Sequence, residues 1–372
     1  MAIAAAAAGN GTANGGGQQA ASAAQNPFWE VSNLFSQKNK QGTVSSFQLT
    51  TTTLNGGGAI NPGNFLRGLR LIVRSTGGVV AAPAADAPFN VFQQLGLENT
   101  DGAEILFNVI GGYAYGQRQR FMRPWLQDPT TAYDYASGAN PSFTLFLQPE
   151  VRQQLGVLEN TDSRSQYTWQ QTINTASAYG VAGGDTAPTV SVTPYVDMWA
   201  QPDDVDLERV PNQRIPPGAN LQTKTRHQTF TLNGAGSSNN FLSTLTGNAV
   251  RCMLLIVRNS LGARVDYLTD PIQWQLDSRN LGTLSPDIVF QWTQDFYAAY
   301  GGRARPTGVY PFPRFFNPGT LYGQGWLYTA NSTALSWESS TLSSGTNLPG
   351  TVELLQEEVY AVGAVDPSLI DL

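Results

Sequence analysis

The side chains that most often carry out catalysis are scarce in this sequence of 372 residues: histidine occurs once, as His227, and cysteine once, as Cys252. A metal site in a double-stranded β-helix takes two or three histidines with a carboxylate. A Ser-His-Asp or Cys-His arrangement would need the same single histidine, and no Gly-x-Ser-x-Gly motif marks a serine nucleophile. We therefore expect no catalytic residue, no metal site and no cofactor site, and a structural or surface role for His227.

Carboxylates are the remaining candidates for chemistry, because a glycosidase needs only two of them. The densest acidic cluster runs from Asp203 to Glu208 and is followed by Pro211, Pro216 and Pro217. Charge combined with proline is typical of an exposed connector, so this stretch predicts a linker over residues 203–220. The glycine-rich stretch 55–58 lacks the Lys and Ser/Thr of a phosphate-binding loop and predicts a hairpin turn.

Two further motifs have ordinary explanations. Asn331-Ser332-Thr333 fits the N-glycosylation pattern, but the N-terminus lacks the basic region of a secretory signal, so we expect no glycan there. Cys252 cannot form an intrachain disulfide and lies in an apolar run, which predicts a buried, inert thiol. A protein without disulfides fits assembly in the reducing cytoplasm of a host cell.

The charge balance argues against a nucleic-acid-binding protein. The net charge is −6 and no run of Lys or Arg is present, so we expect no direct sequence-specific contact with nucleic acid. Only 13% of residues are charged, which suits a surface covered by neighbouring subunits and equally suits many β-rich extracellular proteins. No apolar run reaches the length needed to cross a bilayer.

The elements that would position any site occur twice along the chain. Thr53–Gly58 (TLNGGG) reappears as Thr231–Gly236 (TLNGAG), and Leu71–Arg74 (LIVR) reappears as Leu255–Arg258. A repeat unit this long is not that of a solenoid, whose units have about 20–50 residues. It predicts a duplicated domain.

Further matches follow in the same order in both copies: Asp86-Ala87-Pro88 with Asp270-Pro271, Ile105–Phe107 with Ile288–Phe290, Tyr115-Gly116 with Tyr300-Gly301, Arg118/Arg120 with Arg303/Arg305, Trp169 with Trp337, and Tyr195-Val196 with Val359-Tyr360. The separation drops from 185 residues at Tyr115/Tyr300 to 168 at Trp169/Trp337. The first copy is therefore predicted to hold a 17-residue insertion between Tyr115 and Trp169, forming a surface loop.

Short apolar or alternating segments separated by Gly, Asn and Pro predict strands at 70–74, 90–97, 142–147, 165–172, 188–199, 253–258, 272–276, 325–330, 334–339 and 352–362. Helices are expected at Ser285–Tyr300, stopped by Gly301, and more weakly at Ile105–Tyr115. About eight strands in each copy with few helices predict an all-β fold of two tandem eight-stranded jelly rolls.

The N-terminal segment carries the candidate contact residues of this chain. Residues 1–26 are mostly Ala, Gly, Asn, Gln and Ser, which predicts a flexible arm. Residues 27–42 are predicted to form an amphipathic helix, with a proline at its first position. Its candidate assembly or membrane-proximal contacts are Phe28, Trp29, Val31, Leu34 and Phe35. Packing of the same apolar face against the base of its own subunit is the alternative, and it is slightly favoured because the helix is short. The remaining boundaries are jelly roll 1 at 43–202, the linker at 203–220 and jelly roll 2 at 221–372.

The sequence resembles a double jelly-roll major capsid protein in five features taken together. These are the tandem copies, the strands ending in Leu-Ile-Val-Arg, the Asp-Ala-Pro-Phe segment at 86–89, the helix ending in Tyr-Gly and the N-terminal helix. The likeness is to the family found in tectivirus-like, membrane-containing icosahedral bacteriophages, and it covers residues 27–372. The resemblance implies pseudo-hexameric homotrimers that build an icosahedral virion shell around an internal membrane. It implies contacts with penton and minor capsid proteins and with membrane lipid near the N-terminal helix.

Two other classes remain open from the residues alone. A trimeric virion spike or receptor-binding protein would also be rich in β-structure, although no shaft repeat is present. A two-domain carbohydrate-active β-sandwich protein would use some of the 8 Trp and 14 Tyr residues as sugar platforms. A glycan array and a hydrolase screen distinguish the last class from the others.

Overall fold

The computed structural model describes residues 37–40, 45–100, 104–130, 142–151, 156–162, 164, 166–199, 221–277, 279–314, 325–342, 344 and 346–361. The predicted arm at 1–26, the contact residues Phe28, Trp29, Val31, Leu34 and Phe35, and the predicted linker at 203–220 lie outside these ranges.

The first half of the chain folds into two facing sheets. Its strands are β1 (Gln37–Lys40), β2 (Ser45–Gln48), β3 (Leu54–Ala59), β4 (Phe65–Thr76), β5 (Phe92–Asn99), β6 (Glu104–Ile110), β7 (Ser142–Leu147), β8 (Leu158–Glu159), β9 (Tyr167–Ile173) and β10 (Thr189–Trp199). One sheet has the order β1-β10-β4-β7, with β2 also paired to β10, and the other has the order β6-β5-β9-β3. The chain crosses repeatedly from one sheet to the other, as in a jelly roll: β2, β4, β7 and β10 lie in one sheet and β3, β5, β6 and β9 in the other.

The second half repeats this arrangement. Its strands are β11 (Leu221–Thr231), β12 (Ser238–Ser243), β13 (Ala249–Arg258), β14 (Leu268–Leu276), β15 (Arg279–Leu284), β16 (Val309–Pro313), β17 (Leu327–Tyr328), β18 (Leu335–Thr341) and β19 (Thr351–Ala361). The two sheets have the orders β11-β19-β13-β16 and β12-β18-β14-β15. Both halves therefore have the same topology, and the predicted pair of eight-stranded jelly rolls is confirmed.

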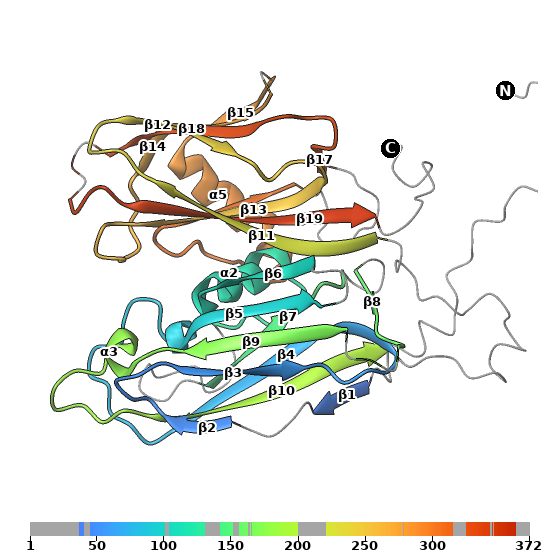
Figure 1. Ribbon diagram of the computed structural model, residues 1–372. Helices are drawn as coiled ribbons and strands as arrows, with labels where there is room; N and C mark the ends of the chain where they lie inside the picture. The colour runs from blue at the N-terminus through green and yellow to red at the C-terminus, as the bar shows by residue number, and fades with distance from the viewer. Residues whose placement is uncertain are drawn as a thin grey trace, which may run out of the picture.

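The two rolls are joined into one body. Strand β6 of the first roll pairs in parallel with β11 of the second at Phe107 and Thr225, which makes one sheet continuous through both rolls. Figure 1 shows the second roll stacked on the first, with helix α2 (Gly112–Met122) between them. The junction is thus built from a sheet and a helix rather than from a connector alone.

Strand β13 explains why the run from Met253 to Arg258 is almost continuously apolar. Met253, Leu255 and Val257 point into the core of the second roll. Cys252, Leu254 and Ile256 point the other way, into a core shared with the first roll. A strand covered on both faces needs apolar residues at every position, which is what the sequence pattern indicated.

Helices follow equivalent strands of the two rolls, β6 in the first and β15 in the second. Helix α5 (Pro286–Phe296) begins at Ser285, whose side chain accepts a hydrogen bond from the Ile288 amide at 3.2 Å. The turn η2 (Ala298–Tyr300) follows, and the chain leaves it through Gly301 with φ of 86°. The predicted helix at 285–300 and its glycine stop are confirmed. Within the described residues, the remaining helical elements are η1 (Phe89–Val91) and α3 (Ala176–Tyr179).

The helix predicted at Ile105–Tyr115 is wrong in its first half. Residues Glu104–Ile110 form strand β6, and the helix begins only at Gly112. Gly111 and Gly112 mark the change of direction: a Cβ at Gly112 would lie 2.4 Å from the Phe89 carbonyl oxygen. The match of Ile105–Phe107 with Ile288–Phe290 is therefore a coincidence of residue types, because one segment is a strand and the other lies in α5.

Two further expectations need correction. Residues 37–40, placed within the predicted helix 27–42, form strand β1, paired with β10 from Tyr195 to Met198. The single 17-residue insertion is also wrong. The connection from α2 to β7 is longer in the first roll by 9 residues only: 32 from Gly112 to Thr144 against 23 from Pro286 to Val309. A separate excess of 7 residues lies before Tyr115, in the connection from β4 to β5: 23 from Arg74 to Leu97 against 16 from Arg258 to Trp274. Part of the connection from α2 to β7, residues 131–141, lies outside the described ranges.

Candidate assembly site at the junction of the two rolls

Three arginines converge on one carboxylate where α2 of the first roll meets the second roll. Arg118 Nη2 donates to Glu357 Oε1 at 2.9 Å, and Arg123 Nη1 lies 2.5 Å from the same oxygen. Arg251, on β13, donates to the other oxygen, Oε2. All four side chains are at most 1% exposed. Glu357 is therefore the charge that binds the two rolls at this point.

The same guanidinium groups satisfy several backbone and hydroxyl oxygens. Arg118 Nε donates to Thr225 Oγ1 on β11 at 2.8 Å. Nη2 groups of Arg118 and Arg123 each donate to the Gln148 carbonyl oxygen at 3.0 Å. These bonds fix β11, α2 and the segment after β7 in one arrangement, because buried polar groups left without partners are costly.

The electrostatics of the cluster are asymmetric, with three cations on one anion. Burial by itself would raise the pKa of Glu357, but the charges of Arg123, Arg251 and Arg118 outweigh burial and hold that pKa below its usual range. Burial lowers the pKa of Arg118 and Arg123, that of Arg123 to about 9, and the attraction of Glu357 only partly opposes this. Glu357 is consequently ionised at neutral pH, and removing its charge would leave buried cations uncompensated.

A second ionic contact between the rolls is centred on Asp86, in the connection between β4 and β5. Arg264 Nε donates to Asp86 Oδ1 at 2.7 Å, and Arg258 Nη1 lies 2.6 Å from Asp86 Oδ2. The guanidinium groups of Arg264 and Arg258 also lie over the ring of Tyr113 on α2, at 4.6 and 5.6 Å from its centroid. Both arginines come from the second roll, so this contact also crosses the junction.

His227 belongs to the outer part of this network. Its Nε2 lies 3.6 Å from Glu353 Oε2, and Glu353 Oε1 accepts from Arg258 Nε at 2.6 Å. Cys252 is buried and faces the shared core, where burial raises the pKa of its thiol above the usual range. Both residues lie at the junction of the rolls, and neither lies beside a second histidine or cysteine, since the chain has one of each.

Arg303 of the second roll caps the carboxyl end of α2 by hydrogen bonds to backbone carbonyl oxygens. It donates from Nη1 to the Arg120 carbonyl oxygen at 2.8 Å and from Nη2 to the Pro124 and Leu126 carbonyl oxygens at 2.8 and 3.1 Å. A cation at a helix carboxyl end is favoured by the helix dipole. The Arg-x-Arg pairs that matched in sequence are thus not equivalent in space, because Arg118 lies within α2 while Arg303 lies at its end.

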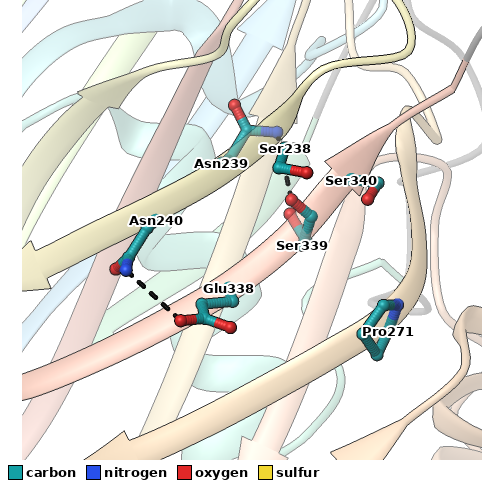
Figure 2. A pocket seen from close by; sticks show the side chains of 7 residues that line it. All are labelled: Ser238, Asn239, Asn240, Pro271, Glu338, Ser339 and Ser340. Carbon is teal, nitrogen blue, oxygen red and sulfur yellow. Dashed lines mark hydrogen bonds between the residues drawn. The ribbon is translucent and has the colours of Figure 1, made fainter.

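A polar hollow lies on the second roll, on the sheet formed by β12, β18, β14 and β15. It has a volume of about 380 Å³, and Figure 2 shows its lining: Ser238, Asn239, Asn240, Pro271, Glu338, Ser339 and Ser340. It forms where β14 bulges away from β18, between the pairs Thr269/Ser340 and Gln273/Glu338. Asn240 Nδ2 donates to Glu338 Oε1 at 3.2 Å. Its lining contains one carboxylate, whereas glycoside hydrolysis takes two.

Within the described ranges, three or more His, Cys, Asp or Glu residues do not gather in a geometry suited to a metal ion. In the same part of the chain, helices long and apolar enough to span a membrane are absent. The acidic stretch Asp203–Glu208 lies outside the described residues, and so do all five predicted contact residues of the N-terminal segment.

Sequence reasoning did not identify the residues of the junction. One signal was available: Glu353, Glu357 and Glu358 lie in a strand, β19, whose other residues are mostly apolar. Carboxylates in a strand that must be buried predict buried partners of opposite charge. The partners themselves are distant in sequence: Arg258 is 95 residues from Glu353, and Arg118 is 239 residues from Glu357. They are found only from the fold.

Solved viral capsid structures share this fold. The structure of Sulfolobus Turreted Icosahedral Virus matches with a TM-score of 0.61 and 14% identity, over 90% of this chain and 95% of that chain. The major capsid protein P2 of bacteriophage PM2 matches with a TM-score of 0.51 and 8% identity, over 89% and 100%. The PBCV-1 virus capsid matches with a TM-score of 0.53 and 9% identity, over 87% and 94%. Neither a family model nor a curated protein sequence matches the chain.

Proposed function

We propose that this chain is a major capsid protein that self-assembles as pseudo-hexameric homotrimers and builds an icosahedral virion shell around an internal membrane. The observation that carries the proposal is the duplication: two rolls with the same strand order are held together by a buried junction centred on Glu357. Three such chains supply six similar rolls, and six similar units around one axis tile a hexagonal lattice.

The buried junction supports this proposal because a lattice needs rolls at a fixed angle. A flexible connector between two independent domains would allow them to reorient, as domains with small polar interfaces commonly do. In this chain α2 is enclosed between the rolls, and the outer face of β13 packs into the first roll's core. The two rolls therefore behave as one rigid block, which is suited to tiling.

The proposed role is structural and not enzymatic, and the proposed location is the virion. The proposed partners are further copies of the chain, penton and minor capsid proteins, and lipid of the internal membrane near Phe28, Trp29, Val31, Leu34 and Phe35. The capsid proteins that share the fold support self-assembly. The acidic net charge of −6 agrees with a shell that faces a membrane rather than bare nucleic acid.

Light scattering on the purified protein tests the proposal. We expect a mass near three times the 40.0 kDa of one chain, at a value that stays constant over a wide range of concentration. A subunit interface of standard size or larger gives that stability. A strictly monomeric protein across the same range would contradict the proposed function.

A further inference from the structure

The polar hollow of the second roll arises where two neighbouring strands separate. Strand β14 advances four positions, from Thr269 to Gln273, while β18 advances two, from Ser340 to Glu338. Ser339 is therefore left without a partner in β14. Bulges that interrupt pairing in this way are common beside functional sites, where they redirect side chains.

In the first roll, the equivalent place is closed by continuous pairing. Trp169 and Trp337 lie on equivalent strands, which makes residues 170–172 of β9 the counterparts of residues 338–340. Residues 170–172 pair one by one with residues 94–96 of β5. The hollow is thus an addition to one of two similar rolls, and the jelly-roll fold alone does not account for it.

The lining of the hollow carries several hydrogen-bonding groups and one charge. Glu338 contributes a carboxylate and Asn240 an amide, and Asn240 Nδ2 donates to Glu338 Oε1 at 3.2 Å. Among the described residues, no group donates to Glu338 Oε2 or to Asn240 Oδ1. Ser238 and Ser340 each add a hydroxyl group. Both acceptors and hydroxyls are thus present for a ligand.

Ser339 adds a second observation that points to a ligand. It lines the hollow opposite the bulge, its residue is only 3% exposed, and its hydroxyl has no hydrogen-bond partner among the described residues. Buried polar side chains in folded proteins nearly always have such a partner. A polar molecule bound in the gap between β14 and β18 would supply it.

The chemistry of the lining selects the class of ligand. An anion would meet Glu338 and no lysine or arginine. A calcium ion takes about 6–8 oxygen ligands, commonly with several carboxylates, and the lining has one. A neutral molecule with several hydroxyl groups fits, because its hydroxyls can donate to Glu338 and Asn240 and accept from the serines. Pro271, across the gap on β14, offers an apolar ring to its C–H face (Figure 2).

We propose that this hollow binds one sugar unit of a glycan. Its volume of about 380 Å³ is within the range of ligand pockets, roughly 300–1,000 Å³. Because the lining has one carboxylate where glycoside hydrolysis takes two, the site binds the sugar without cleaving it. This activity is additional to the proposed capsid function and resides within a single chain.

Binding to saccharides tests the proposal. The labelled full-length protein is applied to an array of immobilised glycans, and the terminal monosaccharide of the glycans that bind is then titrated in free form by saturation-transfer NMR. We expect saturable binding. Glu338→Ala and Asn240→Ala should each raise the dissociation constant at least about tenfold, because each removes an acceptor for a ligand hydroxyl.

The first roll offers a matched control. Gln170 is exposed and is the counterpart of Glu338 on β9, where the strand stays paired with β5. We expect Gln170→Ala to leave the dissociation constant unchanged. Ser340→Tyr keeps the acceptors but fills the hollow, so we expect it to abolish binding. A melting temperature equal to that of the unchanged protein checks that each variant is folded.

The outcomes separate this site from the proposed function. Absence of binding to every glycan on the array overturns the sugar site. Binding that Glu338→Ala, Asn240→Ala and Ser340→Tyr leave unchanged also overturns it, because the sugar then binds elsewhere. Trimers that bind no sugar leave the capsid proposal standing, whereas monomers that bind sugar through Glu338 overturn the capsid proposal and leave the site.

Discussion

Arg118 on α2 and Glu357 on β19 are 239 residues apart in sequence, yet Arg118 Nη2 lies 2.9 Å from Glu357 Oε1 in the closed interior between the rolls. Arg123 reaches the same oxygen, and Arg251 of the second roll reaches the other. A buried ion pair of this kind adds little net stability compared with apolar packing, but breaking it is costly. It therefore fixes one relative arrangement of the two rolls.

Glu357→Gln should destabilise the whole protein. The substitution keeps the shape of the side chain but leaves three buried guanidinium groups without an anion, so we expect a loss of about 3–5 kcal/mol in the free energy of unfolding. Chemical denaturation followed by fluorescence measures it. Because the rolls share a core, both should unfold in one transition.

Glu338→Gln is the matched control for this experiment. Glu338 lies on the surface of the second roll, in the polar hollow, and accepts from Asn240. We expect a change within about 0.5 kcal/mol, as for other surface substitutions. Similar losses for both variants, or a first roll that unfolds separately, would show that the Glu357 cluster does not hold the rolls together.

The stability of the protein should fall at acid pH. The pKa values of Glu357 and Glu353 lie below their usual range in the folded protein. A carboxyl group with a depressed folded pKa stabilises the fold above its unfolded pKa, about 4.3 for Glu, and this contribution is lost as the pH falls through the folded pKa. Melting temperatures measured from pH 7 down to pH 3 should drop below about pH 4.5.

The same titration of Glu357→Gln provides the comparison. That variant has already lost the depressed carboxyl group of Glu357, so its melting temperature should start lower and fall less steeply over the same pH window. Parallel curves for the variant and the unchanged protein would mean that Glu357 does not contribute to the acid sensitivity.

Removal of residues 131–140 should leave the trimer intact, because connections between elements tolerate changes in length. The deletion must spare Asp128, which lies 3.3 Å from Arg120 Nε, caps Thr130 and approaches Arg303 of the second roll at 3.8 Å. Size-exclusion chromatography with light scattering checks the result. Loss of trimers from the deletion, when Asp128→Ala retains them, would mean that the segment is an integral part of the fold or interface.

The N-terminal segment is proposed to contact membrane or neighbouring capsomers. Replacing Phe28 and Leu34 with Ser removes its apolar face. We expect trimers of normal mass that fail to assemble into particles, measured by light scattering and by electron microscopy of assembly reactions. Unfolding of the trimer itself would show that these residues belong to the core, and normal particles would show that they have no role in assembly.

The fold was largely predictable from the sequence because its strands are punctuated and duplicated. Ser142–Leu147 was predicted with the bounds that β7 has, and Trp169 and Trp337 do lie on equivalent strands, β9 and β18. The error at Ile105–Tyr115 arose because a strand and a helix there are separated only by Gly111-Gly112. A short apolar run does not distinguish a strand from a helix by periodicity.

The junction was not predictable in the same way. Arg118 lies in a weakly amphipathic helix and Arg123 directly follows it, and nothing local marks either arginine as buried. Their burial follows from the position of α2 between two rolls, which is a property of the tertiary structure. Ion pairs between distant residues leave no periodic pattern in one sequence, so the three arginines around Glu357 are recognised only when the rolls are placed together.

Negative-stain electron microscopy of the purified protein tests the central claim most directly. The account predicts a uniform population of particles that look nearly hexagonal along the threefold axis, with six similar lobes from three chains. Two-lobed particles of a single chain, or elongated trimers with a shaft, would contradict it.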